Sequence, residues 1–165
     1  MQQDSSKQGV PVAKKSPSQK RAGHASSKQA APQAKSQVSP DTLLAVIRLR
    51  GSIRVSVYVE QTLQFLRLIK NHSCVVIKNT PPNRGMLQKA KDYITWGEIS
   101  KEVYDELLQK RGEKDPDNPK EMKKFFRLAP PRGGLERKGL KHTFTVGGSL
   151  GYRGEHINKL LKKMM

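Results

Sequence analysis

The side chains that could carry out catalysis are few and scattered in this sequence of 165 residues. The histidines His24, His72, His142 and His156 show no H-x-x-x-H spacing, and no G-x-G-x-x-G or Walker pattern is present. The one cysteine, Cys74, lies inside a predicted strand, where a thiol is usually an inert packing residue. Since catalysis needs titratable groups that converge in a pocket, the sequence predicts no enzyme, no metal site and no cofactor.

Two glycine-rich segments carry a different kind of chemistry. The stretches PPRGG at 130–134 and GGSLGYRG at 147–154 combine glycine with arginine, and the second also contains a tyrosine. Glycine lets backbone amides approach a phosphate, arginine binds phosphates or guanine edges through two parallel hydrogen bonds, and tyrosine stacks on an exposed base. The alternative is that these glycines only make turns. In a strongly basic chain we favour contact with RNA.

Other basic residues lie where a sheet and its helices would end. Three arginines flank the exit of the first predicted strand, and further cations lie on the second and last predicted helices. Each one alone could be a solvated surface charge, but together they suggest a basic patch. The candidate RNA-contacting residues are Arg48, Arg50, Arg54, Arg84, Lys89, Arg132, Gly133, Gly134, Tyr152, Arg153 and Lys159.

The net charge supports a polyanionic partner. The chain has 32 Lys and Arg against 14 Asp and Glu, a formal charge of +18 and a pI of about 10.2. Residues 1–40 hold +6 of this charge and no aromatic residue, so we expect a disordered tail. This tail could follow a phosphate backbone or simply aid solubility. No apolar run reaches the ~18 residues of a membrane span, and no signal peptide is expected.

The elements that must position these residues follow from the apolar spacing. Continuous runs of β-branched residues predict strands, and apolar residues that recur every three or four positions predict helices. The expected order is strand 43–49, helix 57–69, strand 74–77, a helix opened by Thr80-Pro81-Pro82, and strand 93–96. This order predicts an α+β domain over 41–97, with one sheet covered by two helices.

The remaining residues, 98–165, form a predicted extension of helices and glycine-rich loops. One helix is expected over 98–111, with Thr95 and Glu98 as its capping box, and another from about 154 to 164. Asn118-Pro119 predicts the start of a short helix leading to Phe125. The stretch GYRG at 151–154 with the following helix also resembles the G-x-x-G loop of a KH domain, although too little chain follows it to complete that module.

Four blocks in order resemble one known family. They are LAVIRLRG at 44–51, NTPPNRGMLQKAKDYITWGE at 79–98, FRLAPPRGG at 126–134 and GGSLGYRG at 147–154. The chain is similar to the large-subunit ribosomal protein numbered thirty in its archaeal form, which is related to the eukaryotic protein numbered seven. The resemblance covers about 41–165 and leaves the first 40 residues outside.

The resemblance implies a fold and a role. The fold would be a three-stranded antiparallel sheet with two helices on one face, a simplified ferredoxin-like arrangement. The role would be a structural one in the large ribosomal subunit in the cytoplasm, with rRNA, including 5S rRNA, and neighbouring ribosomal proteins as partners, and no membrane. The alternative is a free-standing RNA-binding or RNA-annealing protein that uses the KH-like loop and the basic tail.

Overall fold

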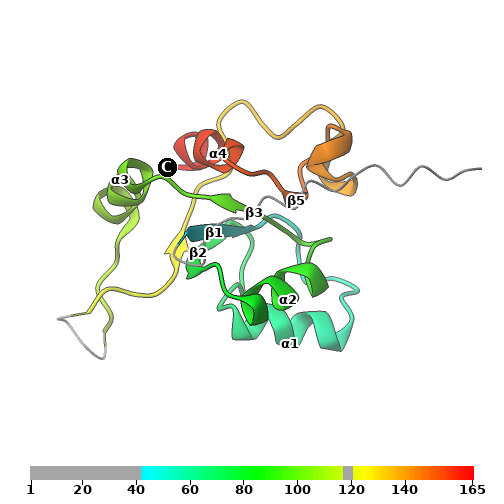
Figure 1. The fold of residues 1–165 in the computed structure, drawn as a ribbon, viewed down its shortest axis with the longest axis horizontal. Helices are drawn as coiled ribbons and strands as arrows, with labels where there is room; N and C mark the ends of the chain where they lie inside the picture. The colour runs from blue at the N-terminus through cyan, green and yellow to red at the C-terminus, as the bar shows by residue number, and fades with distance from the viewer. Residues whose placement is uncertain (1–41, 117–120) are drawn as a thin grey trace, which may run out of the picture. The chain divides into compact units, whose positions relative to one another are not determined.

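A computed structural model describes residues 42–116 and 121–165, and the predicted basic tail therefore lies outside the described residues. The strand–helix–strand–helix–strand order is confirmed (Figure 1). Its elements are β1 (Leu43–Arg48), α1 (Val57–Phe65), β2 (Ser73–Lys78), α2 (Pro81–Lys89) and β3 (Ile94–Glu98). The extension adds α3 (Lys101–Arg111), β4 (Phe126–Arg127), β5 (Gly151–Tyr152) and α4 (His156–Met164), with 3-10 turns at Gly139–Lys141 and Phe144–Val146.

The sheet is larger and more mixed than the expected three antiparallel strands. Its order is β4-β2-β1-β3-β5. β1 pairs antiparallel with β2 and β3, so that Val46 lies opposite both Val75 and Trp96. At the edges, β4 pairs antiparallel with β2, and β5 pairs parallel with β3. The α+β class therefore holds, while the three central strands are completed by two short strands from the extension.

The two helices of the core cover one face of the sheet, as expected, and the helices of the extension cover the other face. Side chains alternate across a strand, so Leu44 and Val46 of β1 face one layer while Ala45 and Ile47 face the other. The first layer contains α1 and α2, and the second contains α3 and α4 (Figure 1). The extension thus buries the second face of the central strands, which explains why all four of these β1 side chains are buried.

One local expectation in the extension is wrong, and another falls partly outside the described residues. Thr95 and Glu98 belong to β3, so they do not cap a helix, and α3 begins only at Lys101. The amide of Ser100, just before this helix, donates instead to Oδ1 of Asn158 at 3.2 Å. The short helix expected near 118 starts at residues outside the description, and from Glu121 onward the chain forms an isolated bridge and then β4.

Close approach between β3 and the start of α4 fixes where the extension sits. A Cβ atom at Gly97 would lie 2.1 Å from the carbonyl oxygen of Gly154, so only glycine fits there. The Arg153 amide donates to the Trp96 carbonyl oxygen at 2.9 Å in the same region. None of the helices in the described ranges has the length and apolar character that crossing a membrane requires.

Candidate nucleic-acid interface

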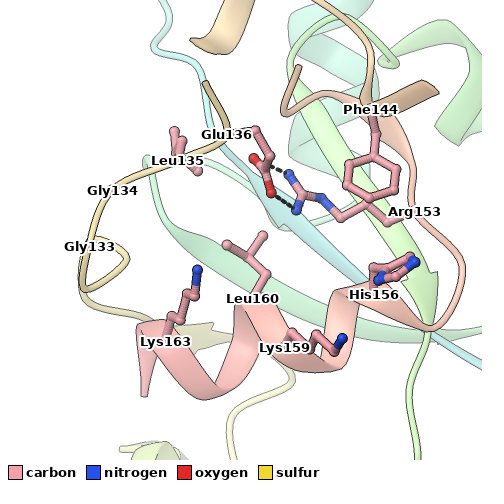
Figure 2. Close-up of a pocket in the computed structure, with 10 residues that line it drawn as sticks. All are labelled: Gly133, Gly134, Leu135, Glu136, Phe144, Arg153, His156, Lys159, Leu160 and Lys163. Atoms are coloured by element: carbon pink, nitrogen blue, oxygen red, sulfur yellow. Dashed lines mark hydrogen bonds and ion pairs between the residues drawn. The ribbon is translucent and has the colours of Figure 1, made fainter. Parts of the chain in front are cut away.

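The candidate site is a groove of about 200 Å³ between α4 and the glycine loop that precedes it (Figure 2). Gly133, Gly134 and Leu135 form one side, and the exposed face of α4 forms the other. The remaining lining residues are Glu136, Phe144, Arg153, His156, Lys159, Leu160 and Lys163.

The loop side is held in place by the last turn of α4. The amides of Ala129 and Arg132 donate to the carbonyl oxygens of Met164 and Lys163, both at 3.0 Å. These carbonyls belong to the group that a helix end leaves without a partner within the helix. These two hydrogen bonds therefore attach the loop to the end of the helix.

The tip of the loop needs its two glycines for conformational reasons. Gly133 and Gly134 have φ angles of 79° and 77°, in the left-handed region that costs other residues about 1 kcal/mol or more each. No atom lies within 4 Å of where their Cβ atoms would be. The glycines thus serve the turn and leave open space beside the backbone, where an anion can approach.

The helix side carries a cationic stripe. Ile157, Leu160 and Leu161 of α4 are buried against the sheet, whereas Lys159 and Lys163 are exposed. These two lysines are four residues apart on one face, and like charges at that spacing destabilise a helix by about 0.2–0.5 kcal/mol. His156 lies one turn earlier on the same face and also lines the groove (Figure 2). A bound anion would relieve the repulsion between the lysines.

The inner wall of the groove is an ion pair between the buried Arg153 and the partly buried Glu136 (Figure 2). Arg153 Nη2 donates to Glu136 Oε2 at 2.8 Å and to the Ser149 carbonyl oxygen at 2.9 Å, and its Nη1 reaches the same carboxylate. Its Nε donates to Thr95 Oγ1 at 3.0 Å, and its guanidinium carbon lies 4.8 Å from the centroid of the Phe144 ring. Every nitrogen of the guanidinium therefore has a partner within the fold.

The charge of Glu136 is stabilised by the same contacts. Burial raises the pKa of this carboxyl, but hydrogen bonds from Arg153 and Ser149 outweigh burial and lower the pKa to about 2. The carboxylate is ionised at neutral pH and neutralises Arg153. The lysines then give the groove its net positive charge.

The lysines and the open glycine turn make this groove suited to an anion. In the described ranges, no three His, Cys, Asp or Glu side chains cluster as a metal site would require. Burial raises the pKa of the Cys74 thiol to about 12, so this group is no nucleophile at neutral pH. Lysine ammonium groups donate hydrogen bonds to phosphate oxygens, and the open space at Gly133 and Gly134 leaves room for such a group.

Five of the predicted contact residues gather at this groove. Gly133, Gly134, Arg153 and Lys159 line it, and Arg132 is exposed beside it. The exposed Arg84 and Lys89 lie on α2, on the other face of the sheet, and the exposed Arg54 lies in the loop before α1. Arg50 lies between these groups, half-buried, and donates to the Asp92 carbonyl oxygen at 3.1 Å. The prediction thus covers more than one surface.

Arg48 does not fit an exposed interface, because it is only 2% exposed. Its Nη1 donates to the carbonyl oxygens of Leu68 and Ile69 at 2.7 and 2.8 Å. Its Nε donates to the Arg50 carbonyl oxygen at 2.8 Å and its Nη2 to Ser52 Oγ at 3.0 Å. Burial lowers the pKa of Arg48. This arginine joins the two loops at the end of β1 instead of contacting a ligand.

Arg153 also takes a role other than the one expected, and Tyr152 has a partner within the fold. Arg153 is 4% exposed and forms the ion pair described above. Tyr152 belongs to the edge strand β5, and its hydroxyl donates to Glu98 Oε1 at 2.7 Å. The stretch from Gly151 to Gly154 is therefore part of a strand and of the link to α4. It is not the protruding loop that a KH-like clamp needs, which removes the basis of the alternative function.

His156 and Lys163 line the groove but were not predicted as contact residues. The signal was present in the sequence, because residues 156, 159 and 163 follow helical spacing and so share a face of the predicted last helix. What the sequence alone could not place was the glycine loop opposite that face.

Comparison with known proteins agrees with the sequence blocks. The family described as Ribosomal protein L30p/L7e matches residues 44–94. The large ribosomal subunit protein uL30 of Methanopyrus kandleri is 38% identical over 149 residues, covering 71% of this chain and all of the relative. The uL30 proteins of Staphylothermus marinus and Methanosphaera stadtmanae are 40% and 39% identical, covering 76% and 74% of this chain and 99% and 100% of the relatives. With such identity over the full length of these archaeal proteins, the chain belongs to the uL30 family of large-subunit ribosomal proteins.

Proposed function

We propose that this chain is a non-catalytic constituent of the large ribosomal subunit, where it binds rRNA mainly through phosphate contacts. The observation that supports this role best is the groove between α4 and the glycine loop. It presents Lys159 and Lys163 next to exposed backbone while its one carboxylate, Glu136, is already neutralised by Arg153. Family membership makes the large subunit the place to look for the phosphates.

We also propose a division of work along the chain. Residues 41–97 form the core that the family model largely covers, and 98–165 supply the groove. The basic residues at 1–40 add charge that favours any RNA contact made by the ordered part. The remaining exposed predicted residues, Arg54, Arg84 and Lys89, extend the contact to the other face of the sheet.

Sedimentation tests the location. The full-length chain should co-sediment with the large subunit in a salt-washed gradient, and a chain that stays at the top of the gradient would refute the proposal. Probing tagged protein from partly dissociated subunits for 5S rRNA tests that narrower partner.

Salt dependence tests the groove. Replacing both Lys159 and Lys163 with alanine should reduce the slope of log affinity for rRNA against log salt by about 0.7–0.9 for each phosphate that these lysines neutralise. A matched variant, Lys91→Ala with Lys110→Ala, removes the same charge away from the groove and should leave the slope unchanged. Equal slopes in the two double variants would mean that the groove is no special site.

A further inference from the structure

The outer face of α1 and its flanking loops carry large apolar side chains that the fold does not use. The side chains concerned are Ile53, Val57, Tyr58, Phe65 and Ile69, with exposed fractions of 89%, 65%, 81%, 80% and 65%. We call these five residues the α1 face. Within α1 itself the buried residues are only Thr62 and Leu63, so this helix directs its aromatic side chains outward.

The α1 face is held as one surface. Tyr58 and Phe65 are seven residues apart, which places them two turns apart along one side of the helix. The loops before and after α1 are joined by Arg48, whose guanidinium donates to both Ser52 Oγ and the Ile69 carbonyl oxygen. This buried arginine therefore fixes the position of Ile53 relative to that of Ile69.

The α1 face is as large as the largest apolar patches that free protein surfaces show. Aromatic side chains present about 150–250 Å² each, so the five residues together expose roughly 500–600 Å². This value lies at the upper limit of the largest apolar patch on a typical monomer. With its polar rim added, it approaches the ~800 Å² that one partner contributes to a specific interface.

The rim of the α1 face is positively charged. Arg54 and Arg67 lie at the two ends of α1 with φ angles of 58° and 59°, and Lys70 follows the second end, all three exposed. Glu60 is the single acidic residue within α1. A second copy of the chain would bring like charges together, so the complementary surface is apolar with an acidic rim.

We propose that the α1 face docks a protein whose contact surface is apolar and rimmed by Asp or Glu. RNA fits this face less well, because Ile53, Val57 and Ile69 offer no π surface for stacking. Protein interface cores, by contrast, are enriched in aromatic residues and arginine. The docking site lies outside the groove between α4 and the glycine loop, and Arg54 is the one residue that it shares with the proposed rRNA contacts.

Photo-crosslinking in cells that make the full-length protein tests this site. The photoreactive residue p-benzoylphenylalanine replaces Tyr58 or Phe65 in two variants, and Gln88, exposed on α2, in a control. We expect a covalent product at 58 and 65 that resists RNase, is degraded by protease and is absent at 88. Its crosslinked peptide should be apolar with Asp or Glu nearby, and Arg54→Glu with Lys70→Glu should reduce its yield to the control level.

Four results would overturn the inference: an RNase-sensitive product, a product with a second copy of this chain, a partner peptide rich in lysine, or no product above the control at 88. The sedimentation gradients described for the proposed function measure separately whether the chain is incorporated into the large subunit. Loss of incorporation with an intact protein crosslink would refute the proposed function and leave the docking site standing.

Discussion

Replacing Arg153 with alanine separates a structural role from an RNA-binding role for this residue. In the structure, the substitution removes both hydrogen bonds to Glu136 and leaves Thr95 Oγ1 and the Ser149 carbonyl oxygen without their donor. Removing one partner of a buried ion pair costs about 3–5 kcal/mol. The Glu136 side chain is 28% exposed and can regain some water, so we expect the lower end, about 3 kcal/mol of unfolding free energy.

Urea denaturation of the full chain measures this loss. With a slope of about 1.5 kcal/mol per molar urea, a loss of about 3 kcal/mol lowers the midpoint by about 2 M. Arg132→Ala is the matched control, because Arg132 is exposed and also precedes a glycine. This control should change the unfolding free energy by no more than about 0.5 kcal/mol.

The salt slope for rRNA binding gives the opposite ranking. Arg132→Ala should reduce it by about 0.7–0.9, whereas Arg153→Ala, measured where it is still folded, should leave it unchanged. An Arg153→Ala variant of native stability with a reduced slope would refute the buried ion pair and restore the role that the sequence predicted.

Three further predictions concern pH, packing and thiol chemistry. The folded-state pKa of Glu136 is about 2, below its ordinary value of 4.5, so the carboxylate stabilises the folded protein fully above pH 4.5 and ceases to do so as the pH falls toward 2. The difference in unfolding free energy between the native protein and Glu136→Gln should therefore shrink over that range. A constant difference would contradict this. Gly97→Ala places a Cβ 2.1 Å from a backbone oxygen and should cost about 3 kcal/mol in urea unfolding, whereas Gly85→Ala, with open space on α2, should stabilise by up to about 1 kcal/mol; equal effects would argue against the close approach. Burial raises the pKa of Cys74 to about 12, so Ellman's reagent at pH 8 should react only on unfolding, and rapid labelling of the native protein would refute this burial.

The central part of the fold was predictable because its signals are local. β-Branched runs indicated the three strands, and Thr80 followed by two prolines indicated the start of α2. The two edge strands have two residues each, which is too short for any periodic pattern. Their pairing depends on contacts with β2 and β3 far away in the sequence. The cover on the second face of the sheet does have a local signal, because an unbroken apolar run such as 43–47 needs packing on both faces.

The groove was predictable in part for a similar reason. The helical spacing of the last helix puts Lys159 and Lys163 on one face, and glycine beside Arg132 predicts an open turn. What joins these two pieces is a pair of hydrogen bonds from the loop to the end of α4, and no local pattern encodes them. The sequence therefore indicated the parts of the site without showing that they lie together.

The roles of the arginines cannot be assigned correctly when each residue is interpreted by itself. Arg132 and Arg153 both precede a glycine in a basic extension, yet one is exposed and the other is buried. What separates them is a carboxylate 17 residues before Arg153 and a threonine 58 residues before it. In a chain with 32 basic and only 14 acidic residues, acidic side chains are the scarcer partner. An isolated acid such as Glu136 among cations is therefore the better place to start a search for buried ion pairs. Arg48 shows the complementary rule, since alternation along β1 puts it on the same face as the buried Leu44 and Val46, where only backbone carbonyls and a serine hydroxyl satisfy its guanidinium.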